Sequence, residues 1–176
     1  MFTGIHRTPP LQVGSVTLQE VAPATADFTF KASAPGRLLI TYFGYTNCPD
    51  LCPTTFAALR TALKQLGDQA AKIDIAFITV DPARDSTDIM AGYLASFFSS
   101  GWHALRTDDA AALKQVEEPF LATSSVETTF DGRISVTHTA TTYVVDDTGT
   151  VQVEWGYPTS AADMAGDLTH LLQEAS

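Results

Sequence analysis

The feature that most restricts the fold is the apolar run RLLITYFGY at residues 37–45. The run is rich in β-branched and aromatic side chains, which is typical of a strand buried on both faces of a sheet. A helical pattern follows, because apolar side chains within residues 53–67 recur at a spacing of three or four positions. The two patterns then alternate, with a second buried strand predicted at 72–81 and helices predicted at 86–98 and 108–122. This alternation predicts an α/β fold, with helices on both faces of a central sheet.

The two ends of the chain extend this prediction. Residues 1–14 show no periodicity and predict a flexible N-terminal arm, whereas residues 15–32 contain two alternating runs that predict an edge hairpin. Two further alternating runs flank a turn at 147–149, and a closing helix is expected from about 160 to 172. This order fits a thioredoxin-like core with a mixed sheet, which we expect to form one domain over residues 15–176.

Composition excludes several classes of function. A chain of 176 residues is long enough to bury a core without cross-links, so a disulfide is not needed for stability. The formal net charge of −10 disfavours binding to nucleic acid or to anionic lipid. There is no apolar run of 18 residues and no signal-peptide pattern at the start. We therefore expect a soluble protein, with membrane attachment only through an anchor that lies outside this sequence.

Both cysteines of the chain lie in the segment GYTNCPDLCPTTF, directly after the first predicted central strand. Each cysteine precedes a proline, which disfavours helical backbone, so we expect Cys48 and Cys52 in a rigid loop. Pro53 suits the first position of a helix, which would make Cys52 the N-cap. Unpaired amides and the helix dipole would then favour the Cys52 thiolate.

The spacing of three residues between the cysteines allows either a disulfide or a shared metal ion. Two thiolates rarely satisfy a transition metal alone, so a third ligand is expected. The candidates are His6, Asp50, His103, His138 and His170. His138 is the best placed, because it follows the polar stretch 123–136, which we expect to be a functional loop able to fold over the cysteines. Two thiolates and one imidazole suit copper or zinc, and Cu(I) in particular.

Further residues near the cysteines have structural interpretations, and some have a functional one as well. Asp81 and Asp85 flank Arg84 and could hold the cysteine loop from beneath, although a turn and a helix cap explain them equally well. Tyr45 is interpreted as packing beside the site.

The segments YFGYTNCPDLCPTT, VDPARDS and VTHTATTYVVDDTG together resemble the SCO/SenC proteins, which are copper chaperones of cytochrome c oxidase assembly. The resemblance implies that Cys48, Cys52 and His138 bind one copper ion, as Cu(I) or Cu(II). It implies a monomeric metallochaperone that delivers copper to the CuA-bearing subunit of the oxidase and could receive it from another copper chaperone. It also implies an extracytoplasmic location with a membrane anchor.

A thiol-disulfide oxidoreductase is the alternative function. Cys48 would then attack the disulfide of a partner protein, and Cys52 would resolve the mixed disulfide. The three-residue spacing, His138, and Ala140 at the position where thioredoxins carry a cis-proline favour copper instead. A peroxide-reducing enzyme on the same fold has weaker support, because it needs a single activated cysteine with an arginine partner.

Overall fold

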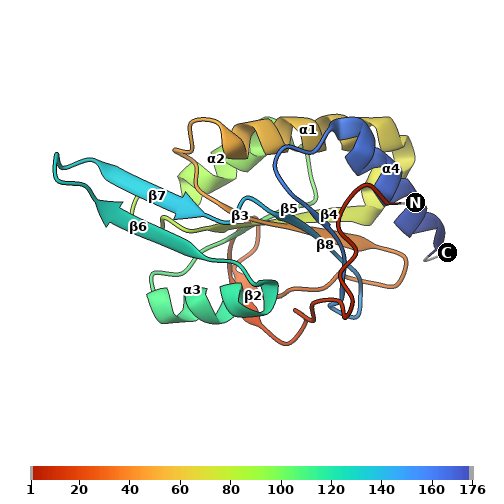
Figure 1. Ribbon diagram of the computed structural model, residues 1–176, viewed down its shortest axis with the longest axis horizontal. Coiled ribbons are helices and arrows are strands. Elements are labelled where there is room, and N and C mark those ends of the chain that lie inside the picture. The colour runs from red at the N-terminus through yellow and green to blue at the C-terminus, as the bar shows by residue number, and fades with distance from the viewer. Residues whose placement is uncertain (1, 175–176) are drawn as a thin grey trace.

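A computed structural model describes residues 2–174 and contains a seven-stranded mixed sheet with helices on both faces (Figure 1). The order of strands across this sheet is β2-β1-β5-β4-β3-β8-β9. The strands are β1 (Thr17–Ala22), β2 (Ala26–Thr29), β3 (Leu38–Gly44), β4 (Ile73–Thr79), β5 (Trp102–Leu105), β8 (Thr142–Val145) and β9 (Val151–Trp155). The predicted α/β class with a central mixed sheet is confirmed.

Strand β3 lies inside the sheet, between β4 and β8, and every one of its residues is buried. It pairs in parallel with β4 and antiparallel with β8. Alternate side chains of β3 enter two separate apolar cores, with Ile40 and Tyr42 in one and Leu39 and Phe43 in the other. A strand that is buried on both faces reads as a continuous apolar run, which is why the sequence indicated it so clearly.

Three helices cover one face of the sheet, and the fourth covers the other (Figure 1). The helices are α1 (Leu51–Leu66), α2 (Thr87–Phe97), α3 (Ala110–Glu117) and α4 (Ala161–Glu174), with short 3-10 helices η1 (Gly67–Lys72) and η2 (Glu118–Phe120). Helices α1, α2 and α4 pack on the core that contains Tyr42, whereas α3 packs on the core that contains Phe43. All four helices lie where the sequence predicted a helix, although their ends differ: α1 begins earlier than predicted, and α3 is shorter than the predicted 108–122.

The polar stretch 123–136 is where the sequence prediction differs from the structure. It was expected to be an irregular loop, but it belongs to a second, two-stranded sheet formed by β6 (Ser124–Thr128) and β7 (Ile134–His138). Asp131 and Gly132 lie in its turn, where Gly132 has a φ of +80°. The hairpin projects from the main sheet (Figure 1), so most of its side chains are exposed, including the apolar Val126 and Ile134. Phe130 near its tip is fully exposed.

The predicted edge hairpin is present as β1 and β2. The preceding residues run beside β9, where Ile5 and Gln12 form isolated β-bridges with Glu154 and Thr150. Arg7 also donates two hydrogen bonds to Glu154. The flexibility of residues 1–14 and the domain boundary after them stay predictions. Across residues 2–174, none of the helices combines the length and apolar character that a bilayer crossing requires.

Candidate metal centre

The site lies at the carboxyl ends of the parallel strands β3 and β4, which stop side by side at Gly44 and Thr79. The backbone N–H of Val80 donates to the carbonyl of Gly44, at 2.8 Å, and joins the two strand ends. The chain then turns, with a hydrogen bond of 3.2 Å from the Cys48 N–H to the Tyr45 carbonyl, before α1 starts at Leu51. The cysteines therefore lie in the crevice beyond the carboxyl ends of the strands, where α/β sheets commonly carry their sites.

The predicted start of α1 is wrong by two residues. Asp50, not Cys52, is the N-cap, so Cys52 lies inside the first turn of the helix. Proline is tolerated throughout the first turn, because the amides there have no partner within the helix. Pro53 therefore did not have to be the first helical residue. The Asp50 carboxylate accepts a hydrogen bond from the Thr54 hydroxyl at 3.1 Å.

The expectation that Cys52 favours its thiolate form is also wrong. The Cys52 side chain is completely buried, and burial raises the pKa of its thiol to about 12. Desolvation of the charged sulfur outweighs any gain at the helix N-terminus. The Tyr42 hydroxyl donates to Cys52 Sγ at 3.8 Å, and the Cys52 N–H donates to Cys48 Sγ at 3.4 Å. Both cysteines are free thiols.

His138, the last residue of β7, lies beside the cysteines. Its Nε2 is 3.7 Å from Cys52 Sγ, and its Nδ1 is 3.0 Å from the Thr139 carbonyl oxygen. A carbonyl oxygen can only accept, so Nδ1 carries the proton and the lone pair of Nε2 faces the sulfur. Burial lowers the pKa of His138, which favours the neutral imidazole that ligates metals. The structure therefore brings one ring nitrogen and two sulfurs within 4.8 Å of one another.

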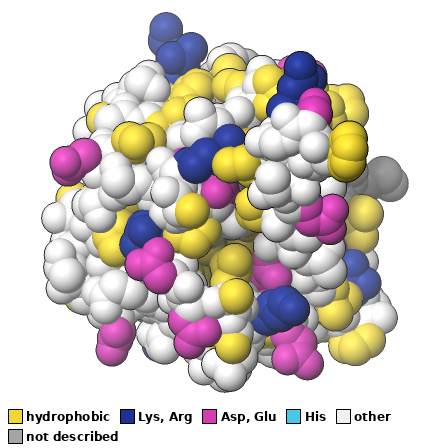
Figure 2. Space-filling model, turned by 90° about the vertical axis from the view of Figure 1, so that its left-hand side faces the viewer, with side chains coloured by type: hydrophobic (Ala, Val, Ile, Leu, Met, Phe, Trp, Pro, Cys, Tyr) yellow, Lys and Arg dark blue, Asp and Glu magenta, His cyan; other side chains and the backbone are white. Residues whose placement is uncertain are grey.

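A surface pocket of about 330 Å³ opens over this group. Its walls come from the cysteine loop, the start of α1 and β7, and its lining is Tyr45, Cys48, Pro49, Asp50, Leu51, Val136, Thr137 and His138. Cys52 lies beneath the pocket, so an approaching molecule meets Cys48 and His138 first. Figure 2 faces the end of the molecule from which the hairpin projects, where apolar side chains gather between scattered charges.

Asp85 fixes the cysteine loop from below. The sequence allowed this role as well as that of a turn or a helix cap. Its fully buried carboxylate accepts hydrogen bonds from the Thr46 N–H at 3.0 Å, the Thr46 hydroxyl at 2.6 Å and the Thr79 hydroxyl at 2.6 Å. Thr46 is two residues before Cys48, so this carboxylate ties the loop to the end of β4. Asp81 forms an ion pair with Arg84, whose guanidinium lies 5.9 Å from the centre of the Tyr45 ring.

Of the other candidate ligands, Asp50 lines the pocket but is not part of the cluster, and the three remaining histidines lie elsewhere. Their partners are the Phe2 ring for His6, Glu20 for His103 and Glu174 for His170. Among residues 2–174, Cys48, Cys52 and His138 are the only such cluster of three or more potential ligands.

The sequence interpretation missed Tyr42 and Gly44 as parts of the site. Both lie in the run that predicts a buried strand, and no local pattern separates them from ordinary core residues. A Cβ atom on Gly44 would lie 2.8 Å from Cys52 Sγ and 2.9 Å from the Tyr42 ring. Gly44 is therefore required by the close approach of the sulfur.

Gly44→Ala is expected to destabilise the protein by about 1 to 3 kcal/mol and to displace Cys52, because the new methyl group overpacks a full core. Chemical denaturation measures the first effect, and the alkylation rate of Cys52 measures the second. Gly92→Ala is the matched control, since its Cβ meets nothing within 4 Å, and it should leave stability unchanged or slightly higher. Equal stability of Gly44→Ala and the parent would show that the sulfur is not confined as described.

In reduced, metal-free protein, iodoacetamide is expected to modify Cys48 long before Cys52. With a pKa of about 12, only about one Cys52 side chain in ten thousand is a thiolate at pH 8, so its reaction should be more than about 100-fold slower than that of an ordinary exposed thiol. Peptide mass spectrometry on Cys48→Ser and Cys52→Ser separates the two rates. Similar rates in the two variants would contradict the burial of Cys52.

Comparison with known proteins identifies relatives of this chain. The family model described as SCO1/SenC matches residues 24–173. A putative copper-binding protein of Stutzerimonas stutzeri is 32% identical over 122 residues, which are 66% of this chain and 57% of that protein. The chain thus spans somewhat more than half of the length of such curated relatives.

Solved structures resemble this protein over nearly its whole length. Copper-bound ScoI of Bradyrhizobium japonicum is 29% identical and has a TM-score of 0.72, covering 89% of this chain and 96% of its own. Apo Sco1 of Thermus thermophilus is 26% identical and has a TM-score of 0.80, covering 97% of both chains. The fold is therefore thioredoxin-like. Because the SCO1/SenC family model matches residues 24–173, well over half of the chain, the chain belongs to the SCO1/SenC family.

Proposed function

We propose that this protein carries one copper ion on Cys48, Cys52 and His138 and delivers it to the CuA-bearing subunit of cytochrome c oxidase. The observation that carries this proposal is the convergence of two unpaired thiols and one imidazole nitrogen within 4.8 Å. The choice of metal is supported by one relative that is named a putative copper-binding protein and by a similar solved structure that has copper bound.

The donor set suits copper on chemical grounds. Two soft sulfurs and one imidazole satisfy Cu(I), which accepts low coordination numbers, whereas a structural zinc site is normally closed by four protein ligands. The neutral imidazole offers its Nε2 lone pair without losing a proton. Cys52 must give up its proton when the metal binds, so the apparent affinity should increase with pH.

The position of the site suits transfer to another protein. Cys48 and His138 line an open pocket, while Cys52 holds the metal from below. A partner's ligands can therefore enter from the open side and replace the protein's ligands one at a time. The net charge of −10 favours a partner with a basic docking face. We propose an extracytoplasmic, membrane-anchored monomer that could receive its copper from a second chaperone.

The test is a Cu(I) titration of reduced protein against a chromophoric chelator, followed by mixing with the metal-free CuA domain of an oxidase. We expect one copper per chain and transfer of that copper to the CuA domain. Cys48→Ser/Cys52→Ser is the matched control and should bind no copper at this site. Failure of the parent protein to compete with the chelator would refute the proposal.

Thiol-disulfide exchange with the same partner is a second candidate function. The supporting observation is the hydrogen bond of 3.4 Å from the Cys52 N–H to Cys48 Sγ, which holds the two free cysteines close together, as attack by one and resolution by the other require. Metal-free protein with reduced cysteines would then reduce an oxidised CuA domain, and Cys52→Ser would trap a mixed disulfide. Absence of the trapped species would exclude this function.

A further inference from the structure

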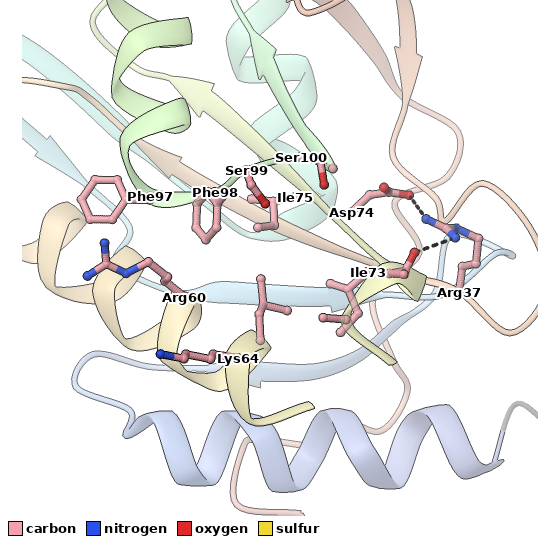
Figure 3. Close-up of a pocket in the computed structure, with 14 residues that line it drawn as sticks. Arg37, Arg60, Lys64, Ile73, Asp74, Ile75, Phe97, Phe98, Ser99 and Ser100 are labelled. Carbon is pink, nitrogen blue, oxygen red and sulfur yellow. Dashed lines mark hydrogen bonds and ion pairs between the residues drawn. The ribbon is translucent and has the colours of Figure 1, made fainter. Parts of the chain in front are cut away.

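A second cavity lies at the opposite end of the sheet from the cysteines. It has a volume of about 570 Å³ and lies between the second half of α1, the end of α2 and the starts of β4 and β5 (Figure 3). The cysteines follow the carboxyl end of β3, whereas this cavity includes Arg37, before β3, and Ile73, the first residue of β4. Arg60 is eight residues after Cys52 on α1, about 12 Å along the helix axis.

Apolar side chains form the floor of this cavity, whereas charged and polar groups form much of its rim. Ile73, Ile75 and Phe98 are nearly completely buried and line it together with the partly buried Leu63 and Phe97. These side chains belong to the same core as the cysteines, so they are held by packing on the sheet and the helices. A cavity with an apolar lining and a few polar groups at its mouth has the general character of a small-molecule site.

The mouth of the cavity is positively charged, although the chain as a whole is strongly acidic. Arg60 and Lys64 are one turn apart on α1 and both exposed, and their side chains border the cavity in Figure 3. Neither cation forms an ion pair with any residue that the structure describes. The Arg60 guanidinium instead lies 5.8 Å from the centre of the Phe97 ring.

The only acidic side chain in the lining is already neutralised. Asp74 accepts a hydrogen bond from Arg37 at 3.1 Å, and Arg37 also donates to the Ala71 carbonyl at 2.9 Å. This pair forms one end of the cavity in Figure 3. On the side across from α1, the exposed residues Ser99 and Ser100 supply hydroxyl groups. An anion at the mouth would therefore meet two free cations and hydroxyl donors, with no free carboxylate to repel it.

We propose that this cavity binds a small amphiphilic anion, namely a carboxylate or phosphate attached to an alkyl chain. The alkyl chain would lie against Phe97, Phe98 and Ile75, and the anionic group would lie between Arg60 and Lys64. Burial of the chain supplies most of the binding free energy, and the two cations select a charged head group over a neutral one. The thiols of the metal centre take no part.

Decanoate is a suitable probe for reduced, metal-free protein, with calorimetry for affinity and amide NMR shifts for location. We expect saturable binding with shifts concentrated at residues 97–101, and binding of decanol at least about tenfold weaker. Arg60→Gln/Lys64→Gln should lose at least about tenfold in decanoate affinity. Lys31→Gln/Arg133→Gln removes the same charge at exposed positions away from the cavity and should bind as the parent does.

A parallel measurement with phosphatidylglycerol vesicles distinguishes a free ligand from a membrane lipid. Binding to both decanoate and vesicles, each reduced in Arg60→Gln/Lys64→Gln, would extend the ligand class to anionic lipids. Three results would overturn the proposal: no saturable binding of decanoate, equal binding of decanol, or unchanged decanoate affinity in the Arg60→Gln/Lys64→Gln protein. The Cys48→Ser/Cys52→Ser protein should bind decanoate normally, so the outcome is independent of the copper proposal.

Discussion

His138→Ala is expected to weaken copper binding by about 100-fold or more while leaving oxidation of Cys48 and Cys52 to a disulfide intact. Loss of groups that merely orient a metal ligand commonly costs 10- to 100-fold in affinity, so loss of a ligand should cost at least the upper figure. The two sulfurs do not depend on the imidazole for their positions, because β3, Asp85 and α1 place them. Competition with a chromophoric Cu(I) chelator measures the first effect, and thiol quantification after oxidation measures the second.

His170→Ala is the matched control for this experiment. His170 is on α4, partly exposed, and distant in sequence from the cysteine loop, with Glu174 3.5 Å away. Its replacement should leave copper affinity unchanged. If His138→Ala bound copper as tightly as the parent protein, the imidazole would not be a ligand.

Asp85→Ala is expected to lower the free energy of unfolding by about 3 kcal/mol. The substitution leaves the Thr46 N–H and the hydroxyls of Thr46 and Thr79 without their acceptor. Each buried unpaired group costs about 1 to 3 kcal/mol, and water that enters the space left by the carboxylate would recover part of this cost. Because Thr46 precedes Cys48 by two residues, the cysteine loop should also lose its fixed position. Denaturant unfolding of metal-free protein measures stability, and the copper affinity of the folded variant measures the effect on the site.

Asp85→Asn is the matched control, because the asparagine side chain has the same shape as aspartate but no charge. An amide oxygen can accept from the Thr46 N–H and the Thr79 hydroxyl, while the amide nitrogen can donate to the Thr46 hydroxyl oxygen. We therefore expect a loss below about 1.5 kcal/mol for this variant. A loss in Asp85→Ala no larger than that in Asp85→Asn would contradict a structural role for the three hydrogen bonds.

The elements that the sequence predicts best are those with a strong apolar pattern. Strand β3 is buried on both faces, and α1 has one buried face, so each leaves a clear periodic signal. Strand β5 has only four residues and was not predicted. The β6–β7 hairpin was missed because most of its side chains are exposed and polar, although the Asp131-Gly132 pair is itself a turn signal.

In the candidate site, too, features set by nearby sequence were predicted, whereas features set by contacts between distant segments were not. The two cysteines are only four positions apart in sequence, and His138 was selected because it follows the stretch 123–136, which was expected to fold over the cysteines. The protonation of Cys52 could not be predicted, because it depends on burial by side chains from other elements, such as Tyr42. A helix-start pattern predicts that the helix dipole stabilises the Cys52 thiolate, but it does not show how deeply the sulfur is buried.

X-ray absorption spectroscopy of copper-loaded, reduced protein tests the central claim most directly. The proposed site predicts one copper per chain, with a first shell of two sulfurs at about 2.3 Å and one imidazole nitrogen at about 2.0 Å, by analogy with other thiolate and imidazole metal sites. The nitrogen shell should disappear in His138→Ala. A spectrum with no sulfur in the first shell, or with the same imidazole contribution in His138→Ala, would contradict the account.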